Sequence, residues 1–308
     1  MDKTFIRVAE VWVPSADGSL LELGSGWFDQ APAFGAISRH MCFGRAEGLP
    51  GHAWDEARPV LLRSFERSYF RRTAAARAAG LSCAVALPIF RQGVLTCVVV
   101  LLCGDSADQV GAIELWRNDP RVTSDLTLAD GYVGATPPPL EDLTRDGSLP
   151  RGAGAPGLAW QREAAVFIDH VESSTQFLRA QVAASAGILR ALALPCSLPG
   201  REAWVLSLLS SAGTPIARRV ESWLPDEAQP SYLQRAFGFC EVRGRLTVNG
   251  RSAAPASALG AIGTAWATGV AQAASATGVA GDTDLHSVLA IPVVAESGAV
   301  SEVVALHF

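Results

Sequence analysis

The strongest constraint on this chain is a four-residue motif that occurs three times at equal intervals. Gly51-His52-Ala53-Trp54 returns as Gly157-Leu158-Ala159-Trp160 and as Gly263-Thr264-Ala265-Trp266. Each motif tryptophan therefore follows the previous one by 106 residues. Because only eight of the 308 residues are tryptophan, this regularity indicates an internal repeat, and a repeat fixes how the chain divides into domains.

Other landmarks keep the same order in every copy. An early segment contains a tryptophan followed by a proline: Ala9-Glu10-Val11-Trp12, Ile113-Glu114-Leu115-Trp116 and Val220-Glu221-Ser222-Trp223. A late segment contains a proline between apolar residues: Leu87-Pro88-Ile89, Leu194-Pro195-Cys196 and Ile291-Pro292-Val293. The sequence therefore predicts three modules, at residues 1–105, 106–213 and 214–308.

The third copy is shorter than the other two. From the motif tryptophan to the late proline the chain takes 34, 35 and 26 residues. In the first two copies this stretch contains an Ala-rich and Arg-containing helix, residues 70–80 and 177–187, that ends at a glycine. The third copy has only residues 271–284 there, with little helical pattern. We therefore expect a truncated third module.

Hydrophobic patterning within copy one predicts an α+β module. Two apolar, β-branched-rich runs joined by Arg91-Gln92-Gly93 predict a hairpin, and their nearly continuous apolar character predicts that both faces of the sheet are covered. The predicted elements are strands at residues 5–13, 20–28, 59–62, 83–90 and 94–102 and a helix at residues 32–43. The links between copies are short, so we expect the modules to pack against one another.

Five segments of copy one together resemble the GAF domain family. They are Ala9-Glu10-Val11-Trp12-Val13-Pro14, Glu47-Gly48-Leu49-Pro50-Gly51-His52-Ala53-Trp54, Arg58-Pro59-Val60, Ala79-Gly80-Leu81 and Ala86-Leu87-Pro88-Ile89. The resemblance covers copy one, most of copy two and both ends of copy three. It implies a fold like that of PAS domains: an antiparallel sheet flanked by helices. It also implies a small ligand between the sheet and its covering helix and loops, or a role in dimerisation.

The chain departs from the family in several features. The family's cyclic-nucleotide signature and its Cys-His pair for bilin attachment are missing from all three copies, as are flanking helices that lead to an output domain. The resemblance therefore implies small-molecule sensing or interaction, with the ligand or cofactor unknown.

Composition removes several function classes. With 25 basic and 30 acidic residues the net charge is −5, which argues against a nucleic-acid binder. No run approaches the ~18 apolar residues of a membrane span, and no export signal opens the chain. The six cysteines form no CxxC pair and suit reduced thiols, so we expect a cytoplasmic protein. The five histidines show no metal-ligand spacing.

The candidate ligand site in copy one is the space between Trp27, Phe28, His40 and the strand that begins at Cys83, with Cys42 as a further candidate. His40 and Cys42 lie on the predicted helix, either facing a pocket or facing outward on an amphipathic helix; the second interpretation is favoured. The motif tryptophans serve either as stacking platforms or, as we favour, in core packing.

Two arginines recur two residues after a phenylalanine. Arg72 and Arg179 are candidates for clamping a carboxylate or phosphate. The alternative, favoured at this point, is that both are solvated charges on a helix face.

These observations predict a cytoplasmic sensory or regulatory protein that binds a small molecule in module one, module two or both. We expect no catalytic output of its own. The alternative is an interaction scaffold that forms a homo-oligomer such as a dimer or docks a signalling partner. A thiol-based enzyme is a third hypothesis, which needs accessible and reactive cysteines.

Overall fold

The structure is a computed structural model. It describes residues 3–28, 30–104, 110–134, 145, 147–196, 202–246, 253–275 and 285–308. Its strands form three antiparallel sheets with helices packed on them, so the α+β class expected from the sequence is confirmed.

All three sheets have the same strand order. The first sheet runs β3-β2-β1-β6-β5-β4, with β1 Ile6–Pro14, β2 Leu21–Trp27, β3 Cys42–Phe43, β4 Val60–Leu62, β5 Leu81–Arg91 and β6 Val94–Gly104. The second runs β9-β8-β7-β12-β11-β10, with β7 Gly111–Asn118, β8 Leu126–Val133, β9 Ser148–Leu149, β10 Val166–Ile168, β11 Arg190–Cys196 and β12 Ala203–Ser210. The third runs β15-β14-β13-β19-β18-β17, with β13 Arg219–Pro225, β14 Tyr232–Cys240, β15 Gly244–Arg245, β17 Gln272–Ser275, β18 Ser287–Val294 and β19 Val300–His307; β16 Ala253–Pro255 pairs with β14.

The repeated Gly-x-Ala-Trp motif lies in one helix over each sheet: α2 Gly48–Glu56, α5 Gly154–Arg162 and α7 Ala261–Thr268. A β-carbon on the motif glycines would stand 2.1, 2.4 and 1.7 Å from the carbonyl oxygens of Gly44, Pro150 and Ala256. The motif alanines are fully buried in all three helices. The glycine and the alanine of the motif are therefore small because the helix packs closely against the preceding segment and the sheet. Trp54 is buried, while Trp160 and Trp266 are partly buried.

The remaining helices are short. They are α1 Pro32–Ser38 and α3 Thr73–Ala78 on the first sheet, α6 Ala180–Ser185 on the second, and the 3-10 turns η1 Val171–Ser173 and η2 Ala256–Ala258. The helix expected over residues 32–43 ends at Ser38, and Cys42 with Phe43 pairs with β2 as an edge strand. Phe43 is buried because its ring packs edge-on against Trp12, with centroids 4.8 Å apart.

The helices expected at residues 70–80 and 177–187 begin later than the pattern suggested, at Thr73 and Ala180. In the third copy, β17 occupies residues 272–275 of the stretch expected to lack a helix, and residues 276–284 lie outside the described part of the chain.

Each sheet uses its two faces differently. In β5, Ala84 and Ala86 face the core beneath the helices of the first sheet, whereas Cys83, Val85 and Leu87 face a second core. This second core contains residues of all three sheets, including Leu192, Leu194, Leu289 and Ile291. The continuous apolar character of β5 and β6 therefore has the predicted cause, because both faces of the sheet are covered.

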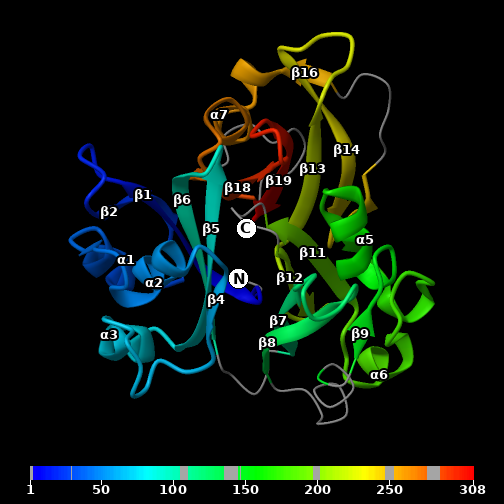
Figure 1. The fold of residues 1–308 in the computed structure, drawn as a ribbon, viewed down its shortest axis with the longest axis horizontal. Coiled ribbons are helices and arrows are strands. Elements are labelled where there is room, and N and C mark those ends of the chain that lie inside the picture. The colour runs from blue at the N-terminus through cyan, green and yellow to red at the C-terminus, as the bar shows by residue number, and fades with distance from the viewer. Residues whose placement is uncertain are drawn as a thin grey trace.

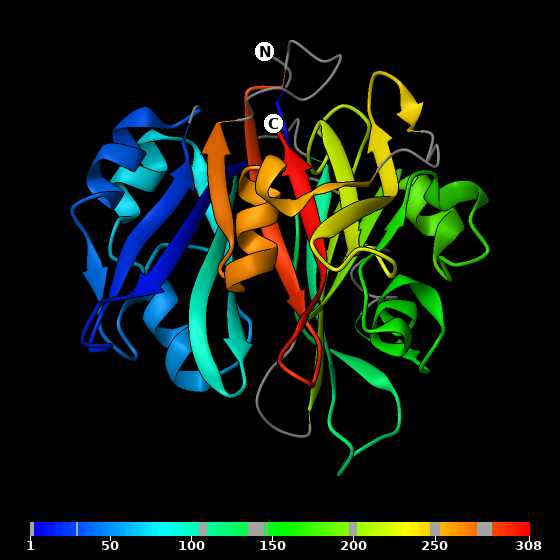
Figure 2. The same cartoon turned by 90° about the horizontal axis from the view of Figure 1, so that it is seen from above.

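The three sheets are arranged around this shared core (Figures 1 and 2). Trp27 of the first sheet stacks on Phe308 at the end of the chain, with ring centroids 3.9 Å apart. Arg63 binds Asp130 between the first and second sheets, and Arg190 binds Glu241 between the second and third. The short links thus join units that pack against one another, as expected.

Candidate functional site

The interior between the first sheet and its helices holds a buried ion pair. Glu10, on β1, accepts a hydrogen bond from Trp12 Nε1 at 3.0 Å and one from Arg72 Nη2 at 2.8 Å. Arg72 Nη1 donates to the other oxygen of Glu10 and to Ser38 Oγ. Arg72 precedes α3 directly, so the helix N-terminus places the guanidinium over the middle of the sheet.

Aromatic rings enclose this guanidinium. The Arg72 Cζ atom lies 4.5 Å from the ring centroid of Phe34 and 5.3 Å from that of Phe70. Trp12 and Phe43 complete the enclosure at 5.5 and 5.9 Å. The chain's own side chains therefore occupy the space in which the family resemblance places a ligand.

The second and third sheets repeat the glutamate and tryptophan. In the second, Trp116 Nε1 donates to Glu114 at 2.9 Å, and Arg179, which precedes α6, donates to both carboxylate oxygens at 2.8 and 3.0 Å. The three strands share a register shift next to the tryptophan, between Val11 and Trp12, Leu115 and Trp116, and Ser222 and Trp223. In each sheet, the irregularity in strand pairing therefore lies beside the tryptophan whose indole contacts the buried carboxylate.

In the third sheet the cations come from other elements. Glu221 accepts from Trp223 Nε1 at 3.1 Å, from Arg219 Nε at 2.9 Å and from Arg235 Nη1 at 3.1 Å. His307 Nε2 lies 3.1 Å from the same carboxylate. Arg219 is on β13 itself, Arg235 on β14 and His307 on β19.

The structure corrects the favoured interpretation of Arg72 and Arg179. Their side chains are 2% and 14% exposed, so they are not solvated charges on a helix face. The physical reason is that each must neutralise a glutamate buried on the sheet, because an unpaired buried charge is costly. Each arginine does clamp a carboxylate, as the alternative interpretation held. That carboxylate belongs to a glutamate of the chain itself and not to a ligand.

The other residues of the predicted site do not converge on one space. Phe28 packs with Phe34 beneath the helices, whereas Trp27 and Cys83 face the shared core between the sheets. His40 and Cys42 are exposed. His40 faces outward, as favoured, but it lies beyond the end of α1 at Ser38 and not on a helix. Trp27 and Phe28 project to opposite sides of the sheet, so the residues of the predicted site do not line one common space.

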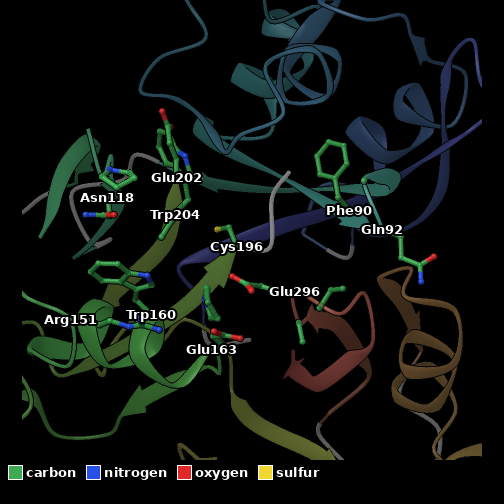
Figure 3. Close-up of a pocket in the computed structure, with 16 residues that line it drawn as sticks. Phe90, Gln92, Asn118, Arg151, Trp160, Glu163, Cys196, Glu202, Trp204 and Glu296 are labelled. Carbon is green, nitrogen blue, oxygen red and sulfur yellow. The ribbon is translucent and has the colours of Figure 1, made fainter. Parts of the chain in front are cut away.

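A cavity of about 560 Å³ lies where turns of all three sheets meet, and we call it the central cavity. Phe90 and Gln92 from the first sheet line one side, opposite Arg151 and Trp160 (Figure 3). Gly93 of the first copy also lines the cavity. The remaining lining residues are Asn118, Pro120, Glu163, Pro195, Cys196, Glu202, Ala203 and Trp204 of the second copy and Val294, Ala295 and Glu296 of the third.

The late proline segments of the repeat meet beside this cavity. Leu87-Pro88-Ile89, Leu194-Pro195-Cys196 and Ile291-Pro292-Val293 together with Val294 surround a small void of about 20 Å³. Pro195, Cys196 and Val294 line both spaces. The sequence marks these segments as repeat landmarks but gives no sign that they converge.

The charged groups of the central cavity are unevenly paired. Glu202 binds Arg117 at 3.1 Å and Arg121 at 3.2 Å. The Arg151 guanidinium lies 5.3 Å from the ring centroid of Trp160. Among the residues that the structure describes, Glu163 and Glu296 make no ion pair. The cavity therefore combines aromatic walls with two exposed carboxylates that have no ion-pair partner among the described residues.

Three of the cysteine thiols are held in their neutral form. Burial raises the pKa of Cys97 to about 11 and that of Cys196 to about 12. The hydrogen bond with Cys83, together with burial, raises the pKa of Cys103 well above its usual range. A raised pKa keeps these thiols protonated at neutral pH, which lowers their nucleophilicity.

Within the described ranges, no group of three or more His, Cys, Asp or Glu residues is arranged to hold a metal ion. No helix in that part of the chain has the length and apolar character needed to cross a membrane.

No family model matches the sequence, and no curated protein matches it either. Similar solved structures include a GAF domain of the nlh2 protein from A. aeolicus, at 17% identity over 33% of this chain and 59% of that one, with a TM-score of 0.27. They also include free methionine-R-sulfoxide reductase from Neisseria meningitidis, at 20% identity, 34% and 53% coverage and a TM-score of 0.25.

A third is an NreA protein from Staphylococcus aureus mutated in its nitrate-binding site, at 17% identity, 35% and 78% coverage and a TM-score of 0.28. This chain thus spans little more than half the length of the first two structures. These likenesses include GAF domains by name, and they assign no ligand or activity to this chain.

Proposed function

We propose that this chain is a cytoplasmic regulatory protein of three GAF-like modules, residues 1–105, 106–213 and 214–308, that binds a small molecule in the central cavity. The observation that carries the proposal is the cavity, whose volume of about 560 Å³ falls within the range of small-molecule sites. The common strand order of the three sheets supports the division into modules. The free cysteines suit a reducing compartment.

The position of the cavity suits a regulatory role. Its walls come from strand ends, turns and a helix of all three modules, so an occupant would contact all three modules at once. A ligand that binds only the assembled arrangement stabilises it by a free energy that grows with the logarithm of the ligand concentration over Kd. The sheet–helix interior of the first module is a weaker candidate, because Arg72 and its aromatic enclosure fill it.

We further propose that the chain has no catalytic output. The raised pKa values of Cys97, Cys103 and Cys196 support this, because thiol chemistry needs the thiolate. Cys196 is the one of these three that lines the central cavity.

The test is a thermal-shift screen of the full chain against a metabolite library, with a cavity-filling variant alongside. Ala203 lines the cavity at the start of β12, and Ala203→Trp should abolish every shift that depends on this site. A ligand present at 100 times its Kd should stabilise the wild-type protein by about 2.7 kcal/mol. Ala36→Trp, at an exposed position of α1, is the matched control and should keep the shifts.

Far-UV circular dichroism checks that Ala203→Trp is folded, and Ala295→Phe, in a turn of the third sheet, fills the same cavity from another side. Shifts that persist in both filled variants would place the ligand elsewhere. A screen with no shift at all would remove the proposal.

The second candidate function is an interaction scaffold that self-associates or docks a signalling partner. The filled interior of the first module favours it, since no ligand is needed to complete that core. Light scattering of the purified chain, with and without cell extract as a source of partners, discriminates the two. A monomer that binds no partner but responds to a small molecule excludes the scaffold.

A further inference from the structure

We infer that the central cavity takes an organic polyamine, a molecule with two or more ammonium groups joined by methylene chains. This inference rests on the proposed function, since it names the class of small molecule that the cavity binds. Two observations support it. The cavity wall has more hydrogen-bond acceptors and carboxylates than cations, and apolar side chains separate these acceptors.

Carboxylates dominate the charge of the wall. Glu163, Glu202 and Glu296 line the cavity, and Arg151 is the cation among its described lining residues. Glu202 is neutralised from outside the cavity by Arg117 and Arg121. The carboxylates of Glu163 and Glu296 have no ion-pair partner among the described residues. An anionic ligand would meet two unneutralised like charges, whereas a cation would neutralise them.

A buried amide adds a further acceptor. Asn118 lines the cavity with 5% of its surface exposed. Its Nδ2 donates to the carbonyl oxygens of Thr123 and Asp125 at 2.9 and 3.0 Å. Both neighbours are acceptors, so the orientation of the amide is fixed and both of its N–H groups are used. Oδ1 accepts no hydrogen bond within the described part of the chain and remains for a donor on the ligand.

Apolar surface separates these acceptors. Phe90, Pro195 and Val294 line the same space, and they come from the first, second and third sheets respectively. Glu163 follows α5 and Glu296 lies in the turn between β18 and β19, so the two carboxylates belong to different modules. A small monoamine neutralises one of them and leaves the apolar wall uncovered. A polyamine presents several N–H donors and lays its methylene groups on the apolar wall.

Isothermal titration calorimetry of the full chain with spermidine tests this inference. The neutral 1,8-octanediol, the dicarboxylate suberate and the monoamine butylamine serve as comparison ligands. We expect spermidine to bind with one site per chain and the other three to bind at least about tenfold more weakly, the scale of one charge-assisted hydrogen bond. Glu163→Gln and Glu296→Gln should each weaken spermidine binding by about tenfold.

Glu227→Gln is the matched control, since it removes the same charge from an exposed position outside the cavity. An equal loss in all three variants would mean that spermidine binds the acidic surface in general, which overturns the inference. Binding of suberate or octanediol that Ala203→Trp abolishes would overturn the polyamine class but leave the proposed function standing. If none of these ligands nor any library compound binds, both fall together.

Discussion

The first and third sheets each neutralise a buried glutamate, but the basic side chains that do so come from different elements. Both place a glutamate in the middle of a central strand, hydrogen-bonded to a tryptophan two residues later. In the first sheet one arginine at the start of a helix neutralises Glu10. In the third, Arg219, Arg235 and His307 reach Glu221 from three strands of the sheet.

The difference shows what the repeat retains when the cation comes from another element. The described part of the third copy has no helix between α7 and β18, so it offers no counterpart to Arg72. A buried carboxylate without a cation would be destabilising, so the carboxylate can persist only where other basic side chains reach it. The buried glutamate and indole are therefore the constant part of the module, and the source of the cation is variable.

The largest effect should come from removing the single cation of the first sheet. We expect Arg72→Met to destabilise that sheet by about 3–5 kcal/mol, because it leaves Glu10 buried and unpaired. Arg219→Met should cost the third sheet less, about 1–2 kcal/mol, because Arg235 and His307 remain on Glu221. Urea titration with pulsed hydrogen exchange, read on peptides from β1 and β13, separates the two sheets.

Arg71→Met is the matched control for the first sheet. Arg71 is adjacent in sequence but exposed, and its ion pair with Glu47 spans 3.3 Å. Its loss should change stability by less than about 1 kcal/mol. Equal losses from Arg72→Met and Arg219→Met would contradict the idea that shared cations buffer the third sheet.

The next effect is a pH dependence in the third sheet. Burial by itself would raise the pKa of Glu221, but the hydrogen bond and charge of His307 and the charge of Arg219 outweigh it and lower the pKa to about 2 from 4.5. A lowered carboxyl pKa contributes stability above pH 4.5 that is lost as the pH falls towards 2. The contribution is on the order of 3 kcal/mol.

Acid titration from pH 5 to pH 2, followed by exchange of the β13 and β19 peptides, measures this loss. Glu221→Gln has no titrating carboxyl at this position and should flatten the dependence of those peptides alone. If the variant and the wild-type protein lose protection in parallel, then the ion cluster of the third sheet is not the cause.

Much of this fold could be predicted from local pattern. The hairpin of β5 and β6 is continuous in apolar residues, which indicates coverage on both faces, and the structure has both. The predicted site failed for a reason that the sequence also contained. Trp27 and Phe28 are neighbours at the end of a strand, so they project to opposite faces and do not line one pocket.

The ion pair and the cavity depend on contacts that no local pattern encodes. Arg72 and Glu10 are 62 residues apart, and an arginine beside an Ala-rich helix looks solvated when considered alone. The available signal was a charge inside an apolar strand, at Glu10, Glu114 and Glu221, since such a charge needs a partner. The central cavity is assembled from strand ends and turns of three sheets and from α5, and local sequence does not reveal which of these segments meet.

Removing the cation of the second sheet should destabilise that sheet less than Arg72→Met destabilises the first. Arg179 holds Glu114 with two hydrogen bonds, as Arg72 holds Glu10, but the Arg179 side chain is 14% exposed against 2%. The Glu114 side chain is itself 2% exposed, so water reaches the carboxylate that Arg179→Met leaves behind through the partly exposed space that the Arg179 side chain vacates. We expect a loss of about 2 kcal/mol, read by the same exchange measurement on β7 peptides. A loss as large as that of Arg72→Met would mean that exposure does not decide the cost.

The smallest loss of stability should come from replacing the serine that hydrogen-bonds to Arg72 in the first sheet. Ser38 Oγ accepts from Arg72 Nη1 and donates to the Phe34 carbonyl oxygen at 2.9 Å. Arg72 Nε already has no hydrogen-bond partner, so Ser38→Ala leaves the guanidinium with fewer acceptors in an enclosure that excludes water. We expect a loss of about 1 kcal/mol in the β1 peptides.

Ser185→Ala is the matched control for Ser38→Ala. Ser185 also donates to a carbonyl oxygen of its own helix, that of Val182 at 2.8 Å, but it is exposed and has no hydrogen bond to a charged group among the described residues. Its substitution should leave the exchange of β7 unchanged. If Ser38→Ala is equally silent, Glu10 alone satisfies Arg72. In that case the contrast between the first and third sheets reduces to the number of cations around one carboxylate.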